Sequence, residues 1–468
     1  MLENLKPYNV FKYFEELCSI PHGSGNCEAI ANYCVEFAKK HNLEYVKDQL
    51  NNVIIKKPAS KGYENKKGVI LQGHLDMVCE KTPESSFNFL KDSLELYIDG
   101  DFIRAKNTTL GGDDGIAVAF VLSILEDDSL EHPFIEALFT TDEETGMYGA
   151  IGLDGSLLNS NTLINIDMEE EGVLTVGCAG GARADITIPL TREKHFGDFY
   201  KITVSGLKGG HSGVEIDKGR LNSNIVLGKI LNELENIRLC EIFGGLKDNA
   251  IPRTSYAVIN TKTDIISLAN SFAQKYAVKE DSELDVTIEK CSFSGECFDE
   301  KTTANVISFL NQTPNGIIAF SKDIEGLVET SLNLGVLKTN KDYVSFSFAV
   351  RSSKESEKQM VLESLQNVTS ICNGKINTHS FYPAWEYREN SPLRDTMKKV
   401  YIDMYKKEPD VTVIHAGLEC GILGEKINDL DAVSFGPNVY DVHTTEEHLS
   451  ISSTKRSYEY LCNILKNL

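Results

Sequence analysis

The sequence predicts an α/β fold in which a mixed sheet flanked by helices forms a discontinuous domain, interrupted by an inserted α+β domain. The chain has 468 residues, which is too long for one simple core. Strand-like and helix-like segments alternate at both ends of the chain, whereas the middle follows another rhythm. We therefore expect one domain from residues 1–185 and 381–468, and the inserted domain from residues 186–380.

The first part of the chain alternates helical and strand-like segments. Residues 26–41 have apolar side chains every three or four positions, which gives a helix one apolar face. Residues 67–74 form an apolar run that ends in a polar cluster, as expected for a buried strand. The other predicted elements are a helix at 8–18, strands at 52–57, 134–140 and 162–166, a hairpin at 96–105 and a helix at 115–126.

The middle and the end of the chain supply the remaining elements. The middle has predicted strands at 184–190, 199–205, 254–261, 283–290, 326–337, 342–350 and 374–380, and helices at 219–237, 264–276, 302–311 and 354–370. The first rhythm returns after about residue 381, with helices at 391–406 and 452–467 and strands at 410–415 and 431–435. Because the last part resumes the pattern of the first, the two are expected to share one domain.

Composition argues against several classes of protein. The formal net charge is -22, whereas binding to nucleic acid or an anionic membrane requires clustered Lys and Arg. The eleven Cys lack CxxC pairs, which argues against a zinc ribbon and indicates reduced thiols. The N-terminal residues lack a signal-peptide pattern, and no apolar stretch approaches the ~20 residues of a membrane span. A cytoplasmic protein is expected.

The stretch Gly112-Asp113-Asp114-Gly115 is central to the predicted chemistry. Glycine permits unusual backbone angles and Asp is a good helix N-cap, so the stretch predicts a tight turn that opens the following helix. Adjacent carboxylates repel each other and are costly to bury unless a positive charge lies between them. Taken alone, however, this stretch is more typical of a solvated turn.

Residue types that bind metal ions follow three of the predicted strands. His74 and Asp76 follow the first, the acidic run 141–144 follows the second, and Asp167 follows the third. The chemistry of α/β sheets collects at the carboxyl ends of strands, where these groups would meet Asp113. The set predicts a two-metal site with a bridging carboxylate. Without Cys ligands, zinc is favoured, with manganese or cobalt as alternatives.

The order of these motifs resembles the M20 family of di-zinc peptidases. The motifs are His74-Leu75-Asp76, Gly112-Asp113-Asp114, Thr141-Asp142-Glu143-Glu144, Ile166-Asp167 and, after the last predicted strand, His443, for which His448 is a rival. Three further motifs resemble the aminoacyl-histidine dipeptidase branch of that family, also described as Xaa-His or cytosolic non-specific dipeptidases. They are Cys178-Ala179-Gly180-Gly181, Gly209-Gly210-His211-Ser212-Gly213 and His415-Ala416-Gly417-Leu418-Glu419-Cys420-Gly421. The resemblance spans nearly the whole chain.

This resemblance implies a role for each residue of the site. The metal ligands would be His74 and Asp167 for one ion, Glu144 and His443 for the other, and Asp113 as the bridge between them. Asp76 would orient His74, and Glu143 would be the general base, since adjacent side chains diverge and only one of them needs to bind an ion. The family pattern also implies a cis peptide bond between Asp113 and Asp114, with no ligand role for Asp114.

Three further residues would contact the substrate. The inserted domain would be the lid of the family, with His211 stabilising the oxyanion and Arg351 binding a substrate carboxylate. Glu419 could receive the free amino group of the substrate. Without the resemblance, His211 would be interpreted as a turn residue, and Arg351 would equally well be a surface side chain.

The expected function is metal-dependent hydrolysis of dipeptides with a free amino terminus, in which a water between the metal ions attacks the scissile carbonyl. A related amidohydrolase, deacylase or tripeptidase is the nearest alternative. A non-catalytic metal-dependent binding protein is a more distant one, because every essential position is filled. The expected partner is a small peptide and neither nucleic acid nor a membrane. The preferred dipeptides, the metal used in the cell and the choice between monomer and homodimer stay open.

Overall fold

The computed structural model describes residues 2–194, 197–322, 324 and 326–468, and the chain divides into two compact units. Unit 1 comprises Met1–Gly177, Tyr387–Val413 and Leu418–Leu468. Unit 2 comprises Cys178–Glu386 and Ile414–Gly417. Unit 1 therefore contains segments from both ends of the chain.

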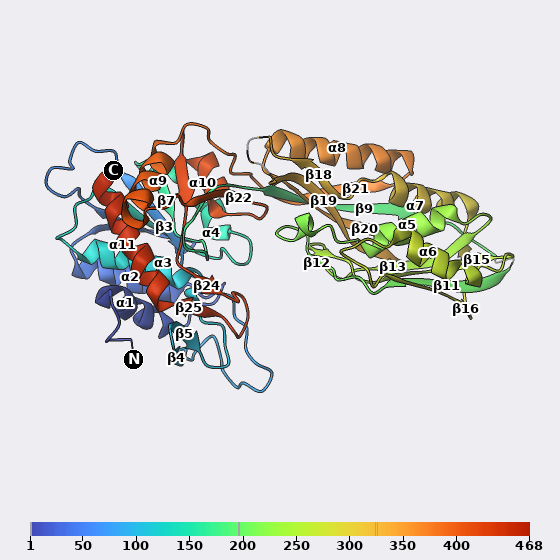
Figure 1. The fold of residues 1–468 in the computed structure, drawn as a ribbon, viewed down its shortest axis with the longest axis horizontal. Coiled ribbons are helices and arrows are strands. Elements are labelled where there is room, and N and C mark those ends of the chain that lie inside the picture. Colours follow the sequence, from blue (N-terminus) through green and yellow to red (C-terminus); the bar gives the residue numbers. More distant parts are fainter. Residues whose placement is uncertain (1, 195–196, 323, 325) are drawn as a thin grey trace. The chain divides into compact units, whose positions relative to one another are not determined.

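An eight-stranded sheet lies at the centre of the described part of unit 1 (Figure 1). The strands, in spatial order, are β1 (Glu44–Lys47), β2 (Val53–Lys57), β6 (Ile135–Thr140), β3 (Val69–His74), β7 (Thr162–Asn165), β23 (Asp431–Ser434), β8 (Val173–Cys178) and β22 (Asp410–Ile414). The sheet is mixed, because β3 runs parallel to β6 and β7 while β2 pairs antiparallel with β6. The central strands β3 and β6 are buried along their whole length, as near-continuous apolar strands require.

Helices pack around this sheet. They are α1 (Tyr8–Cys18), α2 (Glu28–Lys40), α3 (Gly112–Glu126), α4 (Tyr148–Gly152), α9 (Pro392–Tyr405), α10 (Glu419–Lys426) and α11 (Ile451–Asn467). Helix α3 contacts both β3 and α1, and it is buried from Asp114 to Leu125. Its sequence is apolar on all sides, which is typical of a helix inside a core.

A small second sheet of unit 1 carries one of the predicted ligands. In spatial order it contains β24 (Val439–Tyr440), β25 (His448–Ser450), β5 (Phe102–Ala105) and β4 (Leu96–Asp99). The loop that joins β24 to β25 includes His443. The antiparallel pairing of β25 with β5 fixes the end of this loop beside the β4–β5 hairpin.

The start of α3 differs from the prediction. The N-cap residue is Gly111, in the left-handed region with φ of 69°, and it provides no side-chain cap. The helix was predicted from about residue 115 and begins at Gly112, and the carboxylates of Asp113 and Asp114 have partners other than its free N–H groups. The backbone N–H groups at the helix start are bound instead by Glu447, from the loop before β25.

Unit 2 contains a nine-stranded sheet within the described residues. In spatial order the strands are β16 (Asp285–Cys291), β11 (Asp198–Ser205), β15 (Ser255–Thr261), β13 (Arg238–Gly244), β19 (Val328–Thr339), β20 (Tyr343–Ser352), β9 (Gly180–Pro189) and β21 (Lys375–Tyr382), with β18 (Gly316–Phe320) paired to β19. Neighbouring strands pair antiparallel. The helices α5 (Ser223–Glu233), α6 (Ala269–Tyr276), α7 (Glu300–Gln312) and α8 (Glu355–Ile371) pack against the strands and share one apolar core with them.

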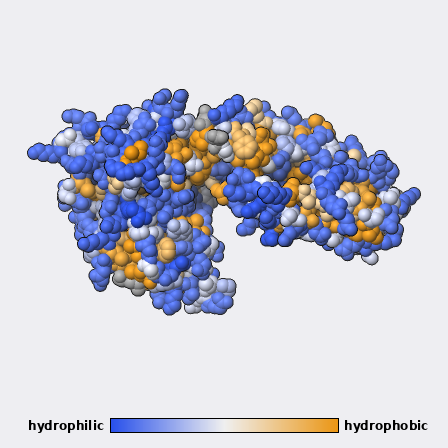
Figure 2. All heavy atoms as spheres, in the orientation of Figure 1, coloured by the Kyte–Doolittle hydropathy of each residue, from blue (hydrophilic) through white to orange (hydrophobic). Residues whose placement is uncertain are grey.

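The surface is consistent with the acidic composition. On the face drawn in Figure 2, hydrophilic residues cover most of each unit, and apolar residues gather in smaller patches. Among the helices of the described residues, none has the length and apolar character needed to span a lipid bilayer. The structure therefore offers no membrane-spanning helix within its described part.

Candidate metal centre

The centre of unit 1 gathers side chains from the ends of parallel strands. His74 is the last residue of β3, and its register partner on β6 is Thr140, which precedes the acidic run 141–144. On the other side, Gln72 of β3 pairs with Asn165 of β7, two residues before Asp167. The parallel register therefore brings the predicted ligands of three separate segments to one edge of the sheet.

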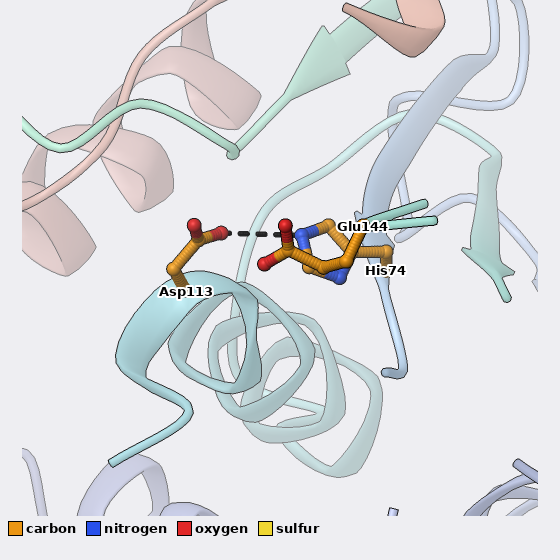
Figure 3. Close-up of side chains that lie close together, drawn as sticks. All are labelled: His74, Asp113 and Glu144. Atoms are coloured by element: carbon orange, nitrogen blue, oxygen red, sulfur yellow. Dashed lines mark hydrogen bonds and ion pairs between the residues drawn. The ribbon is translucent and has the colours of Figure 1, made fainter. Parts of the chain in front are cut away.

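Asp113 lies between two His rings. Its Oδ1 atom is 3.1 Å from His74 Nε2, and its Oδ2 atom is 3.2 Å from His443 Nε2. The same His443 nitrogen lies 3.0 Å from Glu144 Oε1, and His74 Nε2 lies 3.5 Å from Asp167 Oδ1. Figure 3 shows the carboxylates of Asp113 and Glu144 converging on the ring of His74. The two oxygens of Asp113 thus face different His residues, as a bridging ligand requires.

Asp76, two residues after the end of β3, fixes the orientation of the His74 ring. The ring is buried, and Nδ1 lies 3.0 Å from the backbone oxygen of Asp76. A carbonyl oxygen only accepts, so Nδ1 carries a proton, and Nε2 is the ring nitrogen that faces Asp113. The carboxylate of Asp76, at 3.6 Å from Nδ1, is a second partner on the same side of the ring.

Asp76 also holds the acidic turn after β6. Its carboxylate accepts hydrogen bonds from the backbone N–H groups of Glu143 and Glu144, at 3.1 and 3.3 Å, and from Ser24 Oγ at 2.8 Å. The carboxyl pKa of Asp76 is lowered despite its burial, because His74 and these donors stabilise the charge. One side chain therefore couples the orientation of His74 to the position of the Glu143–Glu144 turn.

Asp113 and Asp114 have different surroundings, and the peptide bond between them is cis, as predicted. Asp114 is buried, and its Oδ2 atom accepts a hydrogen bond of 3.2 Å from the backbone N–H of His74. Among the described residues, two groups of side chains have ligand atoms close enough together to hold a cation. They are His74, Asp113 and Glu144, and His74, Asp114 and Asp167. Asp114 is therefore a member of the second group, and its Oδ2 atom also accepts from the backbone N–H of His74.

The charges of the cluster favour binding of a cation. Burial raises the pKa of Asp167 and of Glu143, and the neighbouring carboxylates raise both further. Burial alone would also raise the pKa of Asp113, but hydrogen bonds from His443 and His74 hold it well below its usual range. In turn, Asp113 and Glu144 raise the pKa of His443 to about 11. Buried carboxylates that draw protons onto nearby His rings form a donor set for divalent ions, with nitrogen and oxygen atoms and no thiolate.

Glu419, the first residue of α10, is a buried carboxylate behind the strand ends. Its Oε2 atom accepts hydrogen bonds of 2.6 Å from Gln72 Nε2 and from Thr140 Oγ1. Its Oε1 atom is buried and has no hydrogen-bond partner among the described residues. Burial raises the pKa of Glu419 to about 7. An unpaired carboxylate oxygen in this position is suited to a cationic ligand group.

The predicted residues His211 and Arg351 belong to unit 2, whereas the predicted metal ligands belong to unit 1. His211 ends β12 (Gly210–His211), where its Nδ1 atom accepts hydrogen bonds of 3.2 Å from the N–H groups of Gly213 and Val214. Arg351 lies in β20 and is largely buried. One of its terminal nitrogens donates to the hydroxyl of Tyr382 at 2.9 Å, and its Nε is buried without a partner among the described residues.

Two residues without a role predicted from the sequence, His415 and Glu447, interact with residues of the predicted site in the structure. His415 Nε2 lies 2.7 Å from Ser331 Oγ within unit 2, and the charge of Arg351 acts on the same ring. Glu447, in unit 1, contacts the turn that carries Asp113. The sequence offers little indication of a role for either residue. His415 is one residue of the motif 415–421, and Glu447 is one of two adjacent acidic residues.

The chain is similar to known peptidases over nearly its whole length. A model of "Peptidase family M20/M25/M40" matches residues 70–467. The chain is 37% identical over 480 residues to the cytosol non-specific dipeptidase of Escherichia coli (strain K12), covering 100% of this chain and 99% of that protein. The crystal structure of aminoacylhistidine dipeptidase from Vibrio alginolyticus matches with a TM-score of 0.94 and 35% identity, covering 100% and 98% of the two chains.

A more distant structure shares the fold alone. Aminopeptidase PepT from Bacillus cereus matches with a TM-score of 0.61 and 13% identity, covering 99% of each chain. At this level of identity, the likeness concerns the arrangement of strands and helices and carries no statement about substrate.

Proposed function

Because this chain belongs to peptidase family M20/M25/M40, we propose that it is a metal-dependent dipeptidase that hydrolyses dipeptides with a free amino terminus. The observation that carries the proposal is the position of Asp113, whose two oxygens lie 3.1 and 3.2 Å from Nε2 of His74 and His443. The relative from Escherichia coli, 37% identical over the full chain, is named as a dipeptidase and supports the same substrate class.

The side chains of the centre fit two divalent ions. His74 and Asp167 would hold one ion, Glu144 and His443 the other, and Asp113 would bridge them. Zinc is the favoured ion because the donors are imidazole and carboxylate, and the same donors accept manganese or cobalt. When bound, such ions polarise the scissile carbonyl and lower the pKa of a water toward neutrality.

Glu143 is the proposed general base. The hydrogen bonds of Asp76 to the N–H groups of Glu143 and Glu144 fix the backbone of this turn. Since Glu144 faces His443, the adjacent side chain of Glu143 diverges from it and is not engaged by that ring. We assign to the Glu143 carboxylate the removal of a proton from the attacking water and its delivery to the leaving amine. Asp76 acts by orienting His74.

Glu419 is the proposed receptor for the amino terminus of the substrate. Two donors already bind Oε2, whereas Oε1 has no partner among the described residues. A substrate ammonium would satisfy that oxygen, and an N-acetylated substrate, which has no charge and a bulkier end, would leave it unpaired. This contact would distinguish a dipeptidase from a deacylase.

His211 and Arg351 are the proposed substrate groups of unit 2. Because His211 Nδ1 accepts from two backbone N–H groups, its proton is on Nε2, which can donate to an oxyanion. Arg351 has a buried Nε atom without a partner among the described residues, and a guanidinium in that state is suited to a substrate carboxylate. These assignments follow the family resemblance. The bonded Nδ1 atom of His211 and the Nε atom of Arg351, unpartnered among the described residues, support them.

The remaining proposals concern organisation in the cell. We assign residues 1–185 and 381–468 to the catalytic domain and 186–380 to an inserted lid domain, and the division into two units supports this. The cytosolic relative supports a cytoplasmic location. A homodimer is the proposed assembly, to be distinguished from a monomer by light scattering of the purified protein.

The proposed activity is tested with a panel of short peptides. The purified protein is assayed on Xaa-His and other free dipeptides, on the N-acetylated forms of the same dipeptides and on a tripeptide. We expect hydrolysis of the free dipeptides, loss of activity after chelation and recovery with zinc or manganese. A preference for the N-acetylated forms would identify a deacylase instead.

A Glu419→Gln variant sharpens this test. The amide keeps one acceptor oxygen for Gln72 and Thr140 but removes the negative charge. We expect the KM for free dipeptides to rise about tenfold or more, since a charged hydrogen bond contributes roughly 1.5–3 kcal/mol. An unchanged KM would exclude Glu419 as the receptor for the amino group.

A further inference from the structure

Glu447 connects two parts of the candidate metal centre that are far apart in the chain. It is buried, with 3% of its surface exposed, and lies in the loop between β24 and β25 that also contains His443. Its carboxylate reaches the turn that opens α3 and carries Asp113. The side chain of Glu447 therefore joins the loop that carries His443 to the turn that carries Asp113.

Both oxygens of Glu447 accept backbone hydrogen bonds from this turn. The Oε2 atom accepts from the N–H groups of Leu110 and Gly111, at 2.7 and 3.1 Å. The Oε1 atom accepts from the N–H groups of Gly112 and Asp113, at 2.8 and 3.4 Å. The first N–H groups of a helix lack partners inside the helix and attract negative charge. Glu447 supplies the acceptor oxygens from a position 335 residues away from Gly112.

This contact explains why Asp113 is available to face the His rings. A residue such as Asp at the start of a helix ordinarily turns its carboxylate back onto the free N–H groups. Here Glu447 occupies those donors, and no side chain at the N-cap does so. The approach is close, because a Cβ atom on Gly112 would lie 3.3 Å from Glu447 Oε1 and 3.2 Å from Val439 Cγ1. Asp113 is thereby left free to direct one oxygen to each His.

Hydrogen bonds within the loop between β24 and β25 also hold the segment around Glu447 in place. The backbone N–H of Glu447 donates to the oxygen of Thr444 at 3.2 Å, and Thr444 Oγ1 donates to the oxygen of Asp441 at 2.7 Å. His443 lies within this folded segment, with φ of 62°. A displacement of Glu447 would therefore move the segment that carries His443 relative to the turn that carries Asp113.

We propose that Glu447 is a positioning residue that sets the distance between Asp113 and His443, so that both can bind the same metal ion. This inference rests on the proposed metal-dependent function. It concerns a residue that contacts neither an ion nor the substrate and acts through the backbone of one ligand and the loop of another. Partners of this kind typically change metal affinity by about 10–100-fold when they are mutated.

The test compares Glu447→Gln with Glu447→Asp and with Glu446→Gln, a matched control on an adjacent, exposed carboxylate. A Gln at 447 would present its NH₂ group to one pair of backbone N–H groups and lose those bonds. An Asp at 447 keeps the charge but is one methylene too short to bind both pairs. Metal-free protein is titrated with zinc in a calorimeter, cobalt(II) absorption reports the coordination of the bound ion, and thermal unfolding of the metal-free protein reports stability.

We expect Glu447→Gln to weaken zinc binding about 10–100-fold and to change the cobalt spectrum. Glu447→Asp should lie between this variant and the wild type, and Glu446→Gln should match the wild type. A folded Glu447→Gln protein with wild-type zinc affinity would overturn the inference and leave the proposed function intact. Failure of both Glu447 variants to fold without metal would also overturn it, because the residue would then serve the fold as a whole.

The proposed function is tested by peptide hydrolysis, separately from the zinc affinities. A wild-type protein that binds zinc but hydrolyses no dipeptide would overturn the proposed function. The comparison of zinc affinities would still decide the role of Glu447, because that readout does not depend on catalysis.

Discussion

His443 Nε2 lies 3.2 Å from Oδ2 of Asp113, although 330 residues separate the two in the chain. The other oxygen of the same carboxylate lies 3.1 Å from His74 Nε2. This relationship distinguishes Asp113 from its neighbour Asp114, which accepts a hydrogen bond from the backbone of His74. The two adjacent carboxylates should therefore differ sharply when each is changed alone.

The first prediction compares Asp113→Asn with Asp114→Asn. An Asn at 113 would turn an NH₂ group toward one of the two His rings and lose the bridge, so hydrolysis should fall more than about 100-fold and bound metal should decrease. An Asn at 114 can still accept from the N–H of His74 and should retain both ions. Metal content by mass spectrometry and steady-state kinetics test this. Loss of metal in Asp114→Asn alone would assign the bridge to Asp114.

The second prediction concerns the base. Glu143→Gln should lower kcat by about 10²–10⁴-fold, because the amide cannot accept the proton of the attacking water. Metal content should be unchanged, since Glu144 and not Glu143 faces His443. Glu170→Gln, on an exposed residue, is the control and should behave as the wild type. A Glu143→Gln enzyme with full activity would show that another group is the base.

The third prediction is a pH dependence of stability that arises in unit 2. Burial, followed by the charge of Arg351, lowers the pKa of His415 from 6.5 to about 4, while the backbone of Val328 and Asp217 oppose this and His211 adds to it. Between these two values the unfolded chain binds a proton that the folded chain does not. The contribution is therefore fully present above pH 6.5 and is lost as the pH falls toward 4.

The size of this effect follows from the shift in pKa. At 1.36 kcal/mol per pH unit, the loss over this window is roughly 3 kcal/mol. Urea unfolding of the wild type and of His415→Asn between pH 4 and 7 measures it, and the variant should have the shallower slope over this range. Equal slopes would show that His415 does not titrate differently in the folded state.

The fourth prediction concerns the end of α3, away from the metal ligands. Lys57 of β2 is buried, and its Nζ atom donates to the backbone oxygens of Ile124, Leu125 and Asp127, at 3.2, 3.1 and 2.9 Å. The ammonium therefore satisfies the free carbonyls at the carboxyl end of the helix and complements its dipole.

Replacing Lys57 with Met keeps most of the length of the side chain and removes the three hydrogen bonds of the ammonium group. We expect a loss of about 2 kcal/mol of stability, seen as a lower thermal unfolding midpoint, since hydrogen bonds to charged groups contribute roughly 1.5–3 kcal/mol. Lys61→Met, at an exposed position, is the control and should leave the midpoint nearly unchanged. Equal midpoints for the two variants would show that water replaces the ammonium at no cost.

Local sequence patterns were sufficient for the class of fold. The apolar runs at 67–74 and 134–140 predicted buried strands, and the alternation of strands and helices predicted an α/β fold, which the structure and its likeness to the aminoacylhistidine dipeptidase structure confirm. These predictions succeed because burial of a strand or helix is recorded in the spacing of its own side chains. The group that binds the first N–H groups of α3 was not predicted, because Glu447 is distant from this helix in the sequence.

The sequence by itself determined which residue types stand at the strand ends and, through the order of its motifs, the family to which the chain belongs. Only the tertiary structure decided where these side chains point. Asp113 directs one oxygen to each His, and Asp114 accepts from the backbone of His74. Glu447 binds the turn that carries Asp113. These contacts join segments that lie apart in the sequence, by 39 to 335 residues. A pattern of residues along a chain specifies which groups are present, whereas the packing of strands, helix and loop specifies where their atoms point.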